Sequence, residues 1–171
     1  EALRPFDATQ GKETQGKQDG VASMSSIRFK INDEEKPNLL KMTMPGRFKI
    51  QKFLKTAVDK GCKYMILEVT SEGIMQSRHR FIDFKTAVFT NLEPEHIERH
   101  GSFEKYKMAK GKLFETVKTN HILNLDDKNV EYFSKFPSDK KFYYTLKDNL
   151  EIGSLKIDCK LEIENCKLIK A

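Results

Sequence analysis

The chain has 171 residues, of which 38% are hydrophobic, enough for one domain with a buried core and too few for two ordinary domains. Charged residues make up 33%, and no apolar run approaches the roughly 20 residues of a membrane span. The N-terminal region lacks the apolar segment of a secretory signal, although a start at Glu1 leaves an earlier cleavage open. Composition therefore predicts a cytoplasmic protein without a membrane partner.

The net charge indicates which kinds of partner the chain can bind, and the cysteine spacing indicates the redox state of its thiols. The 31 Lys and Arg exceed the 25 Asp and Glu by 6, which favours phosphate-bearing partners. Because the basic residues are interleaved with acidic ones and form no block of five, we do not expect a nucleic-acid partner. The three cysteines, Cys62, Cys159 and Cys166, have wide and irregular spacing, which predicts reduced thiols and not a disulfide framework.

Residues 1–23 differ from the rest of the chain. They are rich in Gln, Gly, Lys, Asp and Thr, and the sequence TQGK occurs in them twice. Such a segment buries too little apolar surface to offset its ordering entropy, so we predict a disordered tail at 1–23 and one domain at 24–171. The two Gly-Lys pairs do not form a phosphate-binding loop, because that motif needs Ser or Thr after the Lys and an apolar strand before the loop.

From residue 26 onward, strand and helix patterns alternate. Apolar residues at every second position predict a strand at 27–31, followed by a turn at 32–37. A helical stripe at 48–58, ended by Gly61, leads to a continuous apolar run at 64–69, which predicts a strand buried on both faces.

The same alternation continues through the second half. The patterns predict strands at 86–90, 121–125 and 142–145, with helices at 103–117 and 128–136 between them. Strict alternation at 155–163, followed by an apolar pair at 168–169, predicts an antiparallel hairpin. The expected fold class is therefore α/β, a doubly wound and mainly parallel sheet with an appended antiparallel hairpin.

In such sheets, ligands bind beyond the carboxyl ends of the strands. The segments at those ends are 68–78, 91–101 and 124–127. His96 and His100 lie one helical turn apart in the second segment, which would suit a shared metal ion. The residues between them are I-E-R, so the H-E-x-x-H zinc motif is not met, and surface histidines remain the alternative.

The run from Glu68 to Phe114 carries several motifs in a fixed order. They read EVTSEGIMQSR, FTNLEPEHIERHG and YKMAKGKLF. These motifs resemble E-V-S-S-H-x-x-x-x-x-R, F-T-N-L-x-x-D-H-L-D-x-H-G and Y-x-x-A-K-x-x-L-F of the central domain of the Mur ligases, closest to the branch that adds a diamino acid. The sequences TMPG near residue 45 and NLDD near residue 125 resemble the family's T-T-P and N-x-D-D.

The resemblance implies a magnesium site. Glu68 matches an acidic residue that helps to hold the Mg²⁺ bridging the ATP phosphates, and His96 matches a ligand of a second Mg²⁺. Lys110 matches a lysine that these ligases carry as a carbamate, an anionic oxygen ligand suited to Mg²⁺. We therefore expect Glu68, His96 and Lys110 to converge at the carboxyl edge of the sheet.

The resemblance also implies a substrate site and an activity. Thr43, Thr70, Gln76 and Arg78 match residues that contact the UDP-N-acetylmuramoyl-peptide, and the planar guanidinium suits a phosphate or carboxylate. The implied activity is ATP-dependent amide bond formation in peptidoglycan precursor synthesis, through an acyl phosphate.

Several departures from the family pattern accompany this match. Met44, Glu72 and Glu95 replace a Thr, a His and an Asp of the family motifs. The family's phosphate-binding loop, N-terminal domain and C-terminal domain have no counterpart in the sequence. We therefore expect the chain alone to be inactive as a ligase; the alternative is a non-catalytic module on the same fold that binds an anionic ligand or partner.

Overall fold

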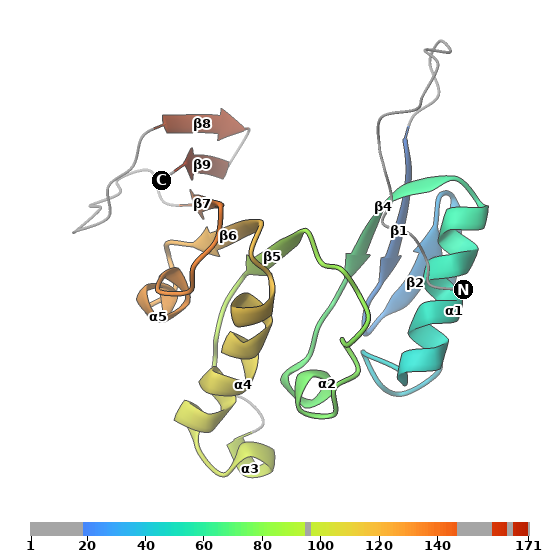
Figure 1. The fold of residues 1–171 in the computed structure, drawn as a ribbon, viewed down its shortest axis with the longest axis horizontal. Helices are drawn as coiled ribbons and strands as arrows, with labels where there is room; N and C mark the ends of the chain where they lie inside the picture. Colours follow the sequence, from blue (N-terminus) through green and yellow to red (C-terminus); the bar gives the residue numbers. More distant parts are fainter. Residues whose placement is uncertain (1–18, 95–96, 147–158, 164–165, 171) are drawn as a thin grey trace.

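The computed structural model describes residues 19–94, 97–146, 159–163 and 166–170, and Figure 1 shows its fold. The described strands form two sheets, a four-stranded one with the order β3-β2-β1-β4 and a five-stranded one with the order β5-β6-β7-β9-β8. The α/β class with parallel strands and an appended hairpin is confirmed. The strands belong to two sheets, however, and not to a single one.

The first sheet begins earlier in the chain than expected. Its strands are β1 (Gly20–Met24), β2 (Arg28–Ile31), β3 (Glu34–Pro37) and β4 (Cys62–Leu67); β4 is parallel to β1, and the other pairs are antiparallel. The predicted tail was wrong at 20–23, because the completely buried Ala22 and Met24 belong to a core strand. The predicted turn at 32–37 was also too long: β3 is an exposed edge strand without an apolar pattern.

Helix α1 (Arg47–Asp59) packs on one face of this sheet (Figure 1). It ends at Lys60, after which Gly61 takes a φ of 78°, a conformation that favours glycine. Two small groups of buried residues fill the space between helix and sheet, Ala22, Ile31, Ala57 and Cys62 in one, and Met24, Met44 and Ile50 in the other.

The opposite face of β4 is open. The predicted burial of both faces was wrong, since Tyr64 and Ile66 are 59% and 64% exposed. Met65 and Leu67, which alternate with them, face the α1 side and join its core. Among the described residues, helix α1 therefore covers only one face of this sheet.

The second sheet contains the larger core. Strands β5 (Thr86–Phe89), β6 (Asn120–Asn124) and β7 (Lys140–Thr145) are parallel, and β9 (Cys166–Lys170) and β8 (Cys159–Ile163) continue the sheet as the predicted antiparallel hairpin. Helices α4 (Phe103–Thr116) and α5 (Val130–Ser134) contribute to one core with these strands. The Phe133 ring stacks on Phe89 at a centroid distance of 4.1 Å and meets Phe114 at 5.0 Å.

Two further helices are short. Helix α2 (Ser71–Met75) lies in the chain between the two sheets, after β4, and α3 (Ile97–His100) lies between β5 and α4. Helix α2 packs against α4 and so connects the two halves of the molecule (Figure 1). None of the helices in the described ranges has the length and hydropathy needed to cross a bilayer.

Candidate functional site

The turn from β4 into α2 is built around Thr70. Thr70 is the N-cap of α2, with extended backbone, and its Oγ1 accepts a hydrogen bond from the Gly73 N–H at 3.1 Å. This is the usual reason for a Thr or Ser at the start of a helix. The predicted substrate-binding Thr70 therefore has a structural contact as well, and its hydroxyl lies at the carboxyl end of β4.

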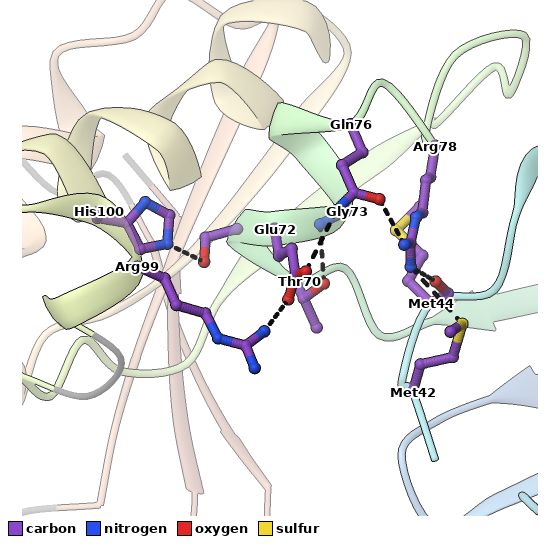
Figure 2. Close-up of polar contacts among 10 residues, drawn as sticks. Met42, Met44, Thr70, Glu72, Gly73, Gln76, Arg78, Arg99 and His100 are labelled. Carbon is purple, nitrogen blue, oxygen red and sulfur yellow. Dashed lines mark hydrogen bonds and ion pairs between the residues drawn. The ribbon is translucent and has the colours of Figure 1, made fainter. Parts of the chain in front are cut away.

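Arg78 contacts Gln76 and the two methionines that flank Thr43 in the chain (Figure 2). Its Nη1 donates to the Met44 carbonyl and its Nη2 to the Gln76 carboxamide oxygen, while the Met42 sulfur lies 3.8 Å from Nη1. Thr43 lies between these two methionines in the chain. Gln76 and Arg78 thus lie together at one end of α2, although Arg78 already has protein partners there.

Gly73 sets how closely α2 approaches the loop that carries Thr43. A Cβ at this position would lie 3.1 Å from Thr70 Oγ1 and 3.3 Å from Met44 Cβ, and still closer to the Met44 sulfur. Met44, a departure from the family motif, is 1% exposed and fills the α1 core. This contact was not predicted from local sequence patterns, because it joins two segments about 30 residues apart.

The other side of α2 contacts α3 (Figure 2). Ser71 Oγ and His100 Nε2 are 3.0 Å apart, and both residues are buried. Glu72, which replaces a family His, forms an ion pair with Arg99. Of the two histidines predicted to share a metal or lie on the surface, His100 is not on the surface: its ring is in the interior and its Nε2 is bonded to Ser71. A metal shared with His96 stays a prediction, because His96 lies outside the described residues.

Glu68 follows directly after β4, as predicted. Its Oε2 accepts hydrogen bonds from the Ser26 backbone N–H at 2.7 Å and from the Ser26 hydroxyl at 3.1 Å. The carboxylate is exposed to solvent and fixed to the β1–β2 turn. A carboxylate oriented in this way at a sheet edge is a suitable ligand for a hard cation.

Lys110 lies on α4, with its Nζ 5.2 Å from the centre of the Tyr106 ring. This is a cation–π contact. His96 lies outside the described residues, and no group of three or more His, Cys, Asp or Glu side chains forms a metal site within the described part of the chain. The convergence of Glu68, His96 and Lys110 therefore stays a prediction.

The two aspartates of the NLDD segment, which follows β6, stabilise the fold through hydrogen bonds. Asp127 accepts hydrogen bonds from the Leu92 and Asn129 N–H groups, both at 2.7 Å. Asp126 accepts from the Thr145 hydroxyl at 2.6 Å and from the Leu146 N–H at 2.8 Å. These carboxylates join the segments that follow β5, β6 and β7 at the carboxyl edge.

Two further histidines are half-buried or buried. His121 Nε2 lies 2.7 Å from the Val117 carbonyl oxygen, and the ring meets Phe114 edge to face. Burial lowers the pKa of His121, and it also lowers the pKa of His79, because the charged imidazolium loses hydration. In both rings the fold therefore favours the neutral form.

Comparison with known proteins gives three concordant results. The family model described as "Mur ligase middle domain" matches residues 13–170. A UDP-N-acetylmuramoyl-L-alanyl-D-glutamate–2,6-diaminopimelate ligase of Caldanaerobacter subterraneus is 33% identical over 128 residues, 75% of this chain and 26% of that protein. The ligase of the same name from Clostridioides difficile is 33% identical over 135 residues, covering 78% and 26%.

A solved structure agrees with these sequence matches. The structure of a UDP-N-acetylmuramoyl-L-alanyl-D-glutamate–2,6-diaminopimelate ligase superposes with a TM-score of 0.62 at 28% identity, over 77% of this chain and 27% of that one. The chain thus spans about a quarter of the length of the curated relatives that it matches.

Proposed function

Because this chain belongs to the Mur ligase family, we propose that it is part of an ATP-dependent amide ligase that adds an amino acid to a UDP-N-acetylmuramoyl-peptide in the cytoplasm. The observation that carries this proposal is that Arg78 contacts Gln76 and the Met44 carbonyl, next to Thr43 in the chain, beside the helix that Thr70 caps. Relatives that act on UDP-N-acetylmuramoyl-L-alanyl-D-glutamate and 2,6-diaminopimelate support the substrate class.

Arg78 is the centre of the proposed substrate site. A guanidinium has five N–H donors, and the contacts with Met44 and Gln76 use only part of them. These contacts hold the planar group in one orientation before the ligand arrives, which lowers the entropy lost on binding. A phosphate or carboxylate of the substrate would accept from the remaining donors in a bidentate manner.

The carboxylate of Glu68 fits the Mg²⁺ ions that the family implies. Glu68 offers a carboxylate that Ser26 orients, and a carbamate on Lys110 would add oxygen ligands of the kind that Mg²⁺ prefers. His96 is the third proposed ligand. When bound, Mg²⁺ would neutralise the charge of the ATP phosphates.

In the proposed reaction, the γ-phosphate of ATP is transferred to a substrate carboxylate, which gives an acyl phosphate and ADP. The amine of the incoming amino acid attacks the acyl carbon, and inorganic phosphate leaves as the amide bond forms. The contribution of this chain is to place the carboxylate-bearing substrate through Thr43, Thr70, Gln76 and Arg78. We expect no ligation by this chain alone, since the sequence contains no loop to hold the γ-phosphate with backbone amides and a lysine.

Binding of UDP-N-acetylmuramoyl-L-alanyl-D-glutamate to the purified chain, measured by calorimetry, tests the proposal. We expect saturable binding that Arg78→Ala weakens at least about tenfold, as for loss of a charge-assisted hydrogen bond. Arg28→Ala is the matched control, because it removes the same charge from an exposed pair with Glu35. Absence of binding, or equal losses in the two variants, would contradict the proposed site.

A ligation assay with UDP-N-acetylmuramoyl-L-alanyl-D-glutamate, ATP, Mg²⁺, bicarbonate and diaminopimelate tests the expected inactivity. Product above the level of a Lys110→Ala variant would show that the chain is active by itself.

A further inference from the structure

His100 lies at a junction between the proposed substrate site and the helix that carries Lys110. Its Nε2 is 3.0 Å from Ser71 Oγ, and its ring centre is 5.1 Å from that of Tyr106 on α4. Ser71 directly follows Thr70, the N-cap of α2, and Tyr106 carries the Lys110 amine over its face. A continuous series of contacts therefore leads from Thr70 to Lys110 through one imidazole.

The environment of His100 indicates that its hydrogen bond matters more than its volume. The residue is 8% exposed, and no described residue bonds its buried Nδ1. An unpaired ring nitrogen in the interior lowers stability, and an apolar side chain at this place would not have that penalty. Among the described residues, the hydrogen bond to Ser71 is the polar contact that offsets this loss of stability.

The backbone on both sides of this contact is tightly defined. Gly101 has a φ of 75° and ends α3, and Ser102 then caps α4, its Oγ accepting from the Lys105 N–H at 3.2 Å. His100 thus has a fixed place relative to α4, and through Ser71 it fixes the first turn of α2.

The neighbouring ion pair is a weaker connection. The side chains of Arg99 and Glu72 are 66% and 42% exposed, so water and salt screen their attraction. The buried Ser71–His100 bond is not screened in this way. It is the stronger of the two polar links between α2 and α3.

We propose that His100 is a positioning residue, which acts through Ser71 to hold Thr70 and the start of α2 in the geometry that binds the UDP-N-acetylmuramoyl-peptide. This inference rests on the proposed function for its ligand. We do not propose that His100 itself contacts that ligand. The two side chains that transmit its effect are Ser71 on one side and Tyr106 on the other.

The test compares His100→Leu with His100→Gln in the full chain. Leucine keeps most of the volume but cannot bond Ser71, whereas the glutamine carboxamide can. We expect the dissociation constant for UDP-N-acetylmuramoyl-L-alanyl-D-glutamate to rise about tenfold in His100→Leu and to stay within about threefold of the unmodified chain in His100→Gln. His121→Leu is the control, because it also removes a buried, hydrogen-bonded histidine but lies away from α2.

Amide hydrogen exchange gives a second readout that needs no ligand. The Gly73 N–H, which bonds Thr70 Oγ1, should exchange faster in His100→Leu and at the unmodified rate in His100→Gln and His121→Leu. If the unmodified chain does not bind the nucleotide, the proposed function fails and this exchange rate alone decides the role of His100. Equal exchange in all variants, or equal weakening of binding by His121→Leu, would overturn the proposal.

Discussion

The two sheets of this molecule differ in how they are stabilised. Among the described residues, the second sheet and its helices share one core of ten buried residues, rich in aromatic side chains that stack and meet edge to face. The first sheet has two smaller groups of buried residues, in which two methionines are prominent, and its outer face leaves Val21, Tyr64 and Ile66 exposed. The second half is therefore the main source of stability, while the proposed substrate site rests on the less strongly packed half.

The largest effect is expected from the centre of the second core. Phe133→Ala removes a completely buried ring that contacts Phe89 and Phe114, so we expect a loss of about 3–5 kcal/mol in the free energy of unfolding. Urea denaturation measures this. A loss below about 1.5 kcal/mol would show that the second sheet is not the dominant core.

The second largest loss of stability is expected where α2 packs against the first half of the molecule. Gly73→Ala places a methyl group against Met44 and Thr70, and we expect a loss of about 1–3 kcal/mol together with weaker nucleotide binding. Gly46→Ala is the matched control, since its Cβ would have no neighbour within 4 Å. Similar stability of the two variants would mean that α2 can move away from Met44 freely.

Acid should destabilise the second half through His121. Its pKa is lowered in the folded chain, so below the ordinary value of 6.5 the unfolded chain binds more protons than the folded one. The free energy of unfolding should fall as the pH drops through that value, and urea denaturation at about pH 7.5 and about pH 5.5 measures the change. His121→Leu should have a smaller difference between the two pH values; an unchanged difference would assign the effect to other groups, such as His79.

The smallest effect is expected on the open face of the first sheet. Ile66→Thr should change the free energy of unfolding by less than about 0.5 kcal/mol, because the side chain is already 64% exposed. Leu67 is the next residue, and its side chain is directed to the α1 core. Leu67→Thr should therefore lower the free energy of unfolding more, by about 1–2 kcal/mol. Equal losses in thermal or urea denaturation would mean that the outer face of β4 is covered in solution.

The sequence predicted the elements of the second half well, because its strands and helices have clear apolar periods. The helix predicted at 103–117 is α4 (Phe103–Thr116), and the hairpin pairs as expected. The first half was harder. Strand β3 is exposed at every position, and β1 lies next to a polar segment that hides its short pattern. Both strands are defined by backbone pairing, β3 with β2 in a hairpin and β1 with β2 and the distant β4, and periodicity does not report such pairing.

The candidate site shows the same limit. The family motifs led to Thr70, Gln76 and Arg78, and the structure brings these residues together around α2. They gave no indication that Arg78 bonds the Met44 carbonyl or that His100 bonds Ser71. These contacts connect residues 34 and 29 positions apart, so they depend on the packing of α2 and not on local sequence.

The division between the two sheets also affects how the purified chain should behave at high concentration. Strands β4 and β5 are each the last strand of a sheet, and each is paired on one side only within the described residues (Figure 1). The free side of such a strand presents a row of backbone N–H and C=O groups, onto which another strand can add. Tyr64 and Ile66 provide apolar surface next to one of these rows. Self-association that increases with protein concentration is the expected physical outcome, and low concentration is the condition under which binding to the monomer is best measured.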